Sequence, residues 1–138
     1  MNRESGKKEF VLQVRVYYED TDAGGVVYHS NYLNFMERAR TEWLRHAGFE
    51  QNTLIEKKGI LFAVRKINID YNKPALFNDL LNIKTRIIEQ RKASFIFEQV
   101  IFNQAEDTVC KADIKIACLN SQTMKPEPIP ETILSELN

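Results

Sequence analysis

The chain has 138 residues, of which 43% are hydrophobic and 28% are charged, and its 19 basic side chains balance 19 acidic ones. This composition is typical of one globular domain, which we expect to span residues 1–138, and it excludes a disordered or collagen-like chain. The balanced charge also excludes a broad basic surface for duplex nucleic acid or anionic lipid.

We expect no secretory signal peptide in the first residues of the sequence. Its first residues, MNRESGKKEF, are polar and charged where a secretory signal peptide would be apolar. No stretch of the sequence reaches the ~20 apolar residues that a membrane-spanning helix needs. We therefore expect a cytoplasmic protein without a transmembrane segment.

The first predicted element is a strand from Lys8 to Tyr18. Apolar and polar residues alternate over this range, which is the period of a strand with one buried face. The alternation places Val16 and Tyr18 on the buried side.

The second element is a helix from Asn31 to Ala47, where the apolar residues recur at helical spacing. Gly48 is a natural C-terminal stop. At the other end we expect the short polar side chain of Ser30 or Asn31 to cap the first turn.

Beyond Gly59 the sequence is rich in Ile, Val and Phe and is interrupted by turn residues, which predicts four further strands. Their expected ranges are Ile60–Tyr71, Leu80–Glu89, Ser94–Asn103 and Thr108–Leu119. From about residue 120 we expect an extended, proline-containing tail and then a short helix from Glu131. One helix followed by antiparallel strands is an α+β plan in which the helix covers the apolar face of the sheet.

The cysteines and histidines do not suggest a disulfide or a metal site. Cys110 and Cys118 fall in the last predicted strand, roughly 26 Å apart at about 3.3 Å per residue, which is too far for a disulfide. Both lie on its apolar side, so we expect buried, reduced thiols. His29 and His46 stand alone, whereas zinc needs three or four ligands at short spacing.

The connection between the first strand and the helix, Glu19–Tyr28, is the stretch with the clearest chemical signal. It brings carboxylates to a helix N-terminus, whose free N–H groups stabilise a carbonyl oxygen that becomes negative during a reaction. Gly24 and Gly25 allow the backbone to approach a substrate closely. An acyl carbon near Asp22 would meet a nucleophile or a base that activates water, so the arrangement favours acyl transfer. His29 is a further candidate, as an N–H donor, an orienting group or a packing residue.

Two other interpretations of the turn are weaker. An isolated Asp-x-Asp is typical of a solvated Asx turn, but the glycines, His29 and the following helix favour a catalytic Asp22. Asp20, Asp22 and Gly25 also match positions 1, 3 and 6 of a calcium-binding EF-hand loop. Position 5 would be a glycine and position 12 an asparagine, so the required oxygen ligands are missing and no metal is expected.

The segment YEDTDAGGVVYH, from Tyr18 to His29, is followed by Asn31-Tyr32 and by Glu37-Arg38-Ala39-Arg40. These motifs resemble the hot-dog-fold thioesterases of the 4-hydroxybenzoyl-CoA thioesterase family, and most of all its YbgC-like acyl-CoA thioesterases of bacteria. The resemblance covers the order of elements to about Leu119.

The resemblance implies a hot-dog fold, in which a curved antiparallel sheet wraps one long helix. It implies homodimers or homotetramers with active sites between subunits. The family's catalytic aspartate matches Asp22, the position that polarises the thioester carbonyl matches Tyr28 and His29, and Asp20 is a supporting residue. Tyr71-Asn72-Lys73-Pro74 to Asp79 also resembles the family and is expected to shape a strand connection.

The basic turn Arg91-Lys92-Ala93-Ser94 resembles the turn that several relatives place near the nucleotide phosphates of CoA. The resemblance therefore implies CoA contacts at Arg91, Lys92 and Ser94, with no separate cofactor because CoA is part of the substrate. We expect an acyl-CoA thioesterase. The alternatives are a hydroxyacyl-thioester dehydratase of the same fold, with His29 as base, and a non-catalytic acyl-binding or envelope-associated adaptor.

Overall fold

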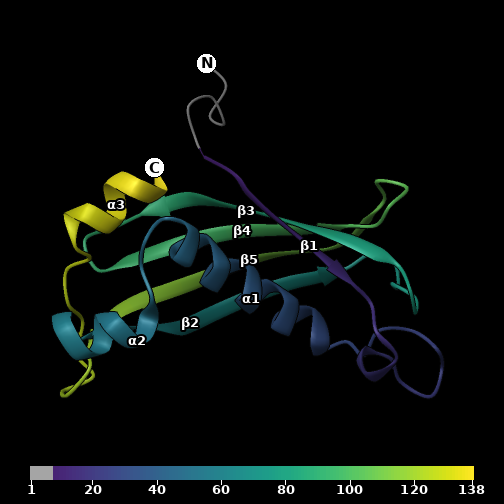
Figure 1. Ribbon diagram of the computed structural model, residues 1–138, viewed down its shortest axis with the longest axis horizontal. Coiled ribbons are helices and arrows are strands. Elements are labelled where there is room, and N and C mark those ends of the chain that lie inside the picture. The colour runs from purple at the N-terminus through teal and green to yellow at the C-terminus, as the bar shows by residue number, and fades with distance from the viewer. Residues whose placement is uncertain (1–7) are drawn as a thin grey trace.

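The computed structural model describes residues 8–138, and its main feature is one five-stranded antiparallel sheet (Figure 1). The strands are β1 (Phe10–Arg15), β2 (Ile60–Tyr71), β3 (Leu80–Gln90), β4 (Ser94–Phe102) and β5 (Thr108–Asn120). Their order across the sheet is β1-β3-β4-β5-β2, so β1 and β2 are the two edge strands. The four strands predicted after Gly59 are confirmed to within one residue at each end.

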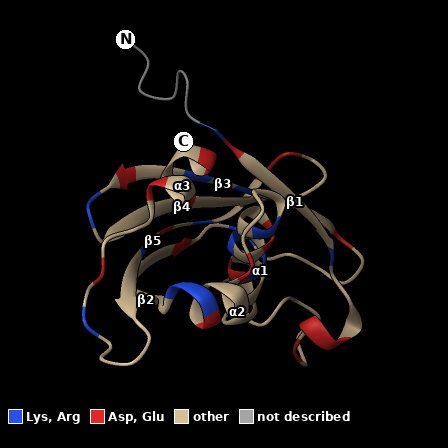
Figure 2. Ribbon diagram, turned by 60° about the vertical axis from the view of Figure 1, so that its left-hand side comes forward, with Lys and Arg blue, Asp and Glu red and all other residues tan. Residues whose placement is uncertain are grey.

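One long helix, α1 (Asn31–His46), lies inside the curve of this sheet (Figure 2). Its buried face presents Tyr32, Phe35, Met36, Ala39, Trp43 and Leu44. Burying such side chains contributes about 1.5–3 kcal/mol each, and this is the main reason why the helix and sheet stay together. The expected α+β plan, with one helix wrapped by a curved sheet, is confirmed.

Buried and exposed side chains alternate along the strands, and the buried ones form the side of the core that faces α1. In β5 the residues Cys110, Ala112, Ile114 and Ile116 are buried, as the sequence period predicts. The two cysteines are free and buried as expected. Burial raises the pKa of Cys110 to about 12 and that of Cys118 to about 11, so both remain protonated thiols at neutral pH.

A buried polar contact fastens the middle of α1 to the sheet. The Gln99 side chain donates from Nε2 to the Met36 carbonyl and to Thr85 Oγ1, both at 2.9 Å. Its Oε1 accepts a hydrogen bond from Arg40 Nη1 at 2.9 Å. Because Gln99 and Thr85 are completely buried, these bonds are needed to offset the loss of water from both side chains.

Two sequence expectations need correction. The first strand ends at Arg15, and Tyr18 lies in a 3₁₀ turn, η1 (Tyr18–Asp20), with 80% of its surface exposed. The chain leaves the sheet there because Val16 bonds to Asp79 at the end of the β2–β3 connection instead of continuing the strand ladder. The sequence also gave no sign of the helical turns α2 (Gln51–Thr53) and η2 (Leu54–Lys58), of which only Leu54 is buried.

The tail matches the expectation of an extended segment followed by a helix. Leu119 and Pro126 form an isolated bridge, the Glu127 amide donates to the Cys118 carbonyl and the Ile129 amide to the Lys92 carbonyl. The helix α3 (Glu131–Leu137) then packs Ile133 and Leu137 into the core. Within the described residues, no helix is long and apolar enough to cross a membrane.

Truncating the centre of β5 tests the core. Ile114 is fully buried, so Ile114→Ala should lower the free energy of unfolding by about 2–5 kcal/mol, measured by urea denaturation. Val11→Ala, at an edge-strand position that is 48% exposed, should change it by no more than about 0.5 kcal/mol. Equal effects would mean that the core is not centred on β5.

Candidate active site

Asp20 organises the turn that leads into α1. Its Oδ2 accepts a hydrogen bond from the Tyr17 amide and its Oδ1 one from Asn31 Nδ2, both at 2.8 Å. Its carbonyl oxygen accepts a third bond, from the Tyr28 amide at 3.0 Å. One residue therefore ties the beginning of the turn to its end and to the first residue of the helix, which is the supporting role expected for Asp20.

Within this frame the chain folds back on itself between Thr21 and Val27, which form an isolated antiparallel bridge. Gly25 has a φ of +81°, a left-handed conformation that glycine adopts without strain. At Gly24 a Cβ atom would lie 3.2 Å from Asp22 Oδ1, which is tighter than ordinary contact. The two glycines are therefore explained by the turn and by the space around the Asp22 carboxylate.

The Asp22 carboxylate lies at the tip of the turn. Its Oδ1 accepts the Gly24 amide at 2.8 Å, the geometry of an Asx turn, and no donor among residues 8–138 reaches Oδ2. The side chain is exposed in the single chain. Asp22 is thus held by one bond and keeps one oxygen free for a reaction.

The helix entrance beside it presents a free backbone amide, that of His29. The Asn31 amide donates to the Tyr28 carbonyl and the Leu33 amide to that of Ser30. For the His29 amide, no acceptor lies within hydrogen-bond distance in the described part of the chain. The Tyr28 amide, in contrast, is already used by Asp20, so of the two expected oxyanion donors only His29 is available.

The expected side-chain cap is absent. Ser30 already has helical dihedral angles, φ −74° and ψ −18°, and its side chain makes no capping bond. The Asn31 side chain donates to Asp20 and accepts from Asn34 Nδ2 instead. No side chain among residues 8–138 therefore competes for the His29 amide, which lies just before the N-terminus of α1, where helix ends bind anions.

A cluster of aromatic rings surrounds His29. Its ring centroid lies 4.5 Å from that of Tyr28 and 6.4 Å from that of Tyr71, and the Tyr71 hydroxyl donates to the His29 carbonyl at 3.1 Å. The Tyr32 hydroxyl accepts the Ala75 amide at 3.0 Å. Burial raises the pKa of both Tyr32 and Tyr71, so both phenols are protonated at neutral pH.

A pocket of about 260 Å³ opens between this cluster and the end of β2. It is lined by Val27, His29, Tyr32, Tyr71, Asn72, Lys73 and Pro74. Asp22 is not among the lining residues. One chain therefore places the carboxylate and the free amide on the same turn, but it does not enclose both around one cavity.

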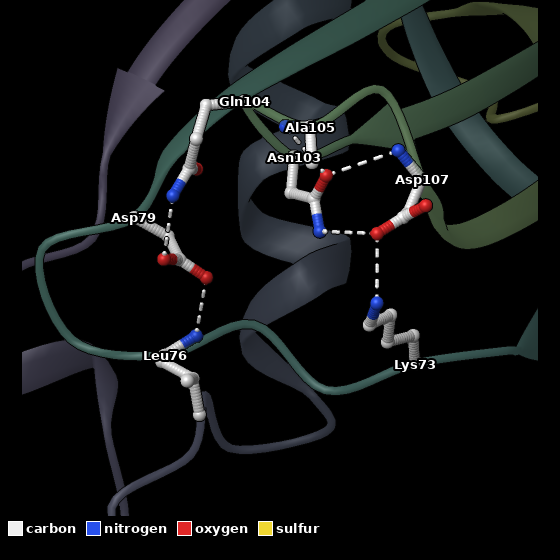
Figure 3. A network of polar contacts seen from close by, with 7 residues as sticks. All are labelled: Lys73, Leu76, Asp79, Asn103, Gln104, Ala105 and Asp107. Atoms are coloured by element: carbon white, nitrogen blue, oxygen red, sulfur yellow. Dashed lines mark hydrogen bonds and ion pairs between the residues drawn. The ribbon is translucent and has the colours of Figure 1, made fainter.

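The connection behind the turn is fixed by a separate polar network (Figure 3). Lys73 Nζ lies 2.7 Å from Asp107 Oδ2, and this contact lowers the pKa of Asp107. Asp79 accepts the Leu76 amide at 2.8 Å and Gln104 Nε2 at 3.2 Å. The β2–β3 connection is thereby tied to the β4–β5 turn, and it supports the Asp22 turn through the bond from the Val27 amide to the Ala75 carbonyl.

Arg91, Lys92 and Ser94 lie far from this turn in the single chain. They form the β3–β4 connection, at the left of Figure 1, whereas the Asp22 turn lies at the right, beyond the other end of the sheet. Arg91 pairs with Glu89 at 3.3 Å on the exposed surface. One chain does not bring these basic residues and Asp22 together.

Tyr71 joins the site, although its sequence position, at the end of a strand and directly before Asn72-Lys73-Pro74, predicts only a strand connection. An exposed aromatic residue at a strand end beside a glycine turn is the signal that would have found it. No group of three or more His, Cys, Asp and Glu side chains able to hold a metal ion occurs within residues 8–138.

Comparison with known proteins gives consistent matches. The family model of the thioesterase-like superfamily matches residues 16–137. The chain is 46% identical to the acyl-CoA thioester hydrolase YbgC of Escherichia coli O6:H1, covering 92% of this chain and 94% of that protein. It is also 46% identical to the acyl-CoA thioesterase YbgC of Haemophilus influenzae, over 90% of each chain. A crystal structure of a probable thioesterase from Bartonella henselae superposes with a TM-score of 0.84 at 40% identity, covering 89% of this chain and 100% of that one.

Asp20→Ala tests the frame of the turn. The substitution removes acceptors for Tyr17 and Asn31, and we expect the free energy of unfolding to fall by about 1–3 kcal/mol in urea denaturation. Asp113→Ala, which removes an exposed carboxylate from β5, should change it by less than about 0.5 kcal/mol. If the two variants are equally stable, Asp20 does not hold the turn.

Proposed function

The chain belongs to the thioesterase-like superfamily, and from this membership we propose that it hydrolyses the thioester bond of an acyl-CoA to a free acid and CoA. The resemblance seen in the sequence, to hot-dog thioesterases and to their YbgC-like members, is confirmed by the comparisons. The chemistry proposed for the site rests on the arrangement of one turn.

The observation that carries the proposal is the placement of a free carboxylate oxygen and a free amide on the same rigid turn. Asp22 Oδ2 is unpaired among the described residues, and the His29 amide at the entrance of α1 has no acceptor there. A thioester whose oxygen binds the His29 amide would present its carbon to Asp22. Asp22 then acts as the nucleophile, or as the base that activates a water molecule.

The helix end stabilises the charge that forms on the carbonyl oxygen. A backbone donor aimed at a developing oxyanion is worth about 3 kcal/mol of transition-state stabilisation in other acyl-transfer enzymes. Tyr28 contributes differently from our first expectation: its amide holds the turn through Asp20, and its ring packs on His29.

A second copy of the chain completes the site. β2 is an edge strand of 12 residues, and it exposes the apolar side chains of Val64, Ile67 and Tyr71. A long unpaired edge with exposed apolar residues favours pairing with another strand. Two copies of β2 that pair antiparallel about a two-fold axis would form one continuous sheet.

This pairing also explains how separated residues meet. In an antiparallel pair, the end of one strand lies beside the beginning of the other. The Asp22 turn, at the end of β2, would then face the beginning of β2 in the second copy. The second copy's Arg91–Ser94 turn would come to the same end of the assembly, where Arg91, Lys92 and Ser94 can contact the phosphates of CoA.

Asp22→Asn tests the chemistry. Loss of the nucleophile or base should lower the rate of thiol release from a panel of acyl-CoAs by about 10²–10⁴-fold, while circular dichroism shows a folded protein because asparagine can still accept the Gly24 amide. Asp113→Asn is the matched control and should leave the rate unchanged. Equal rates in wild type and Asp22→Asn would remove Asp22 from the mechanism, and no release by the wild type from any acyl-CoA would favour the non-catalytic adaptor.

Ile67→Glu tests the second copy. A charge on the apolar edge of β2 should give a monomer by light scattering and abolish most of the activity. Val11→Glu is the control, since Val11 is 48% exposed on the other edge strand and Ile67 is 37% exposed. An active Ile67→Glu dimer would show that β2 is not the interface.

A further inference from the structure

A second pocket, of about 410 Å³, lies between the C-terminal half of α1 and the β2 side of the sheet. Its apolar lining consists of Leu44, Phe62, Val64, Phe95, Phe97, Ile116 and Leu137. This volume is within the range of pockets that bind small molecules, and such apolar walls suit a hydrocarbon chain. The polar residues of the lining determine which chemical group at the end of such a chain can bind.

Arg40 is the unusual member of this lining. Its guanidinium carries five N–H donors, yet within residues 8–138 it makes one hydrogen bond, to the uncharged amide of Gln99, and no ion pair. Burial lowers the pKa of Arg40, with the Glu37 charge opposing this shift, but an arginine remains charged at neutral pH. Arg40 is partly buried, and a partly buried cation without a carboxylate partner is a favourable binding group for an anion.

The charged residues Arg40 and Glu37 line the pocket at different depths. Arg40 reaches the fully buried Gln99 and so lies at the inner side, whereas Glu37 is exposed at the rim. One oxygen of Glu37 accepts a bond from Thr41 Oγ1 at 3.0 Å, and Gln51 Nε2 donates to Thr41 in turn. At the exposed side the pocket also has Arg45 and Glu50, and Arg45 is paired with Glu42 and Glu50. The inner Arg40 has no carboxylate partner within residues 8–138, which favours a ligand whose anionic end reaches Arg40.

We propose that this pocket receives the far end of the acyl group and that Arg40 selects acyl groups ending in a carboxylate over those ending in a methyl group. The proposal rests on the proposed function, because the antiparallel pairing of β2 is what brings a catalytic turn to the pocket beside Phe62 and Val64. The carboxylate forms charge-assisted hydrogen bonds with the free Arg40 donors, and the methylene chain contacts the aromatic walls.

The experiment measures kcat/KM for pairs of acyl-CoAs of equal chain length, one ending in a methyl group and one in a carboxylate. For the best chain length, we expect the wild type to prefer the carboxylate by about tenfold or more, the effect of one charge-assisted hydrogen bond. Arg40→Met should reverse this preference, and Arg40→Lys should keep part of it. A structural role for Arg40 would lower both rates equally and leave their ratio unchanged.

Arg45→Met is the matched control. Arg45 lines the same pocket on the same helix, but its guanidinium is paired with Glu42 and lies 3.7 Å from Glu50. The substitution should leave the preference unchanged. Loss of the preference in Arg45→Met, or an equal preference in wild type and Arg40→Met, would overturn the assignment to Arg40 and indicate that Gln99 or the second copy satisfies the guanidinium.

Calorimetry with free acids covers the case in which Arg40→Met does not fold. The wild type should bind a saturated dicarboxylic acid about tenfold more tightly than the monocarboxylic acid of the same length, and equal affinities would contradict the proposal. This arm also separates the two hypotheses. Absence of hydrolysis with any acyl-CoA would refute the proposed function alone, whereas hydrolysis without a preference and without tighter dicarboxylate binding would refute only the role of Arg40.

Discussion

The hydrogen bonds accepted by Asp20 are the constraint on which the rest of the site depends. Its two carboxylate oxygens and its carbonyl oxygen hold Tyr17, Asn31 and Tyr28, so the turn is closed before any substrate binds. With the turn closed, Asp22 lies at its tip and the His29 amide at the helix entrance. For the mechanism that we propose, groups already in position lose little entropy when the substrate arrives, which is the main advantage of a fixed turn.

A second, buried network joins the middle of α1 to the sheet and includes the residue that we propose binds an anion. Gln99 donates to Thr85 and to the Met36 carbonyl inside the core, and Arg40 donates to Gln99 from the helix. Surface pairs such as Lys73 with Asp107 are worth less because water screens them, although that pair helps to fix the β2–β3 connection. The exposed pair of Lys73 and Asp107 positions the β2–β3 connection. The more buried Arg40 lacks such a carboxylate partner among the described residues, and this is why we propose that it binds an anion.

One chain of this fold carries the parts of a site without assembling them. The carboxylate and amide lie at one end of the sheet, whereas the basic β3–β4 turn and the Arg40 pocket lie toward the other. Antiparallel pairing of two copies through the free edge of β2 would bring these two regions together, because the end of β2 in one copy would lie beside the beginning of β2 in the other. The free edge of β2 would then determine both how two copies assemble and which acyl groups the site accepts.

The sequence by itself determined the period of the strands and of α1, the buried position of Cys110 and Cys118, and the glycine turn with its Asp22, because these depend on neighbours along the chain. Only the tertiary structure decided that the Tyr28 amide is used by Asp20, that Ser30 does not cap α1, and that Tyr71 joins the site. It also decided that Arg91 lies far from Asp22 within one chain and that Arg40 reaches Gln99. Each of these depends on which partner a polar group meets across the sheet, and local periodicity carries no information about contacts between residues distant in sequence.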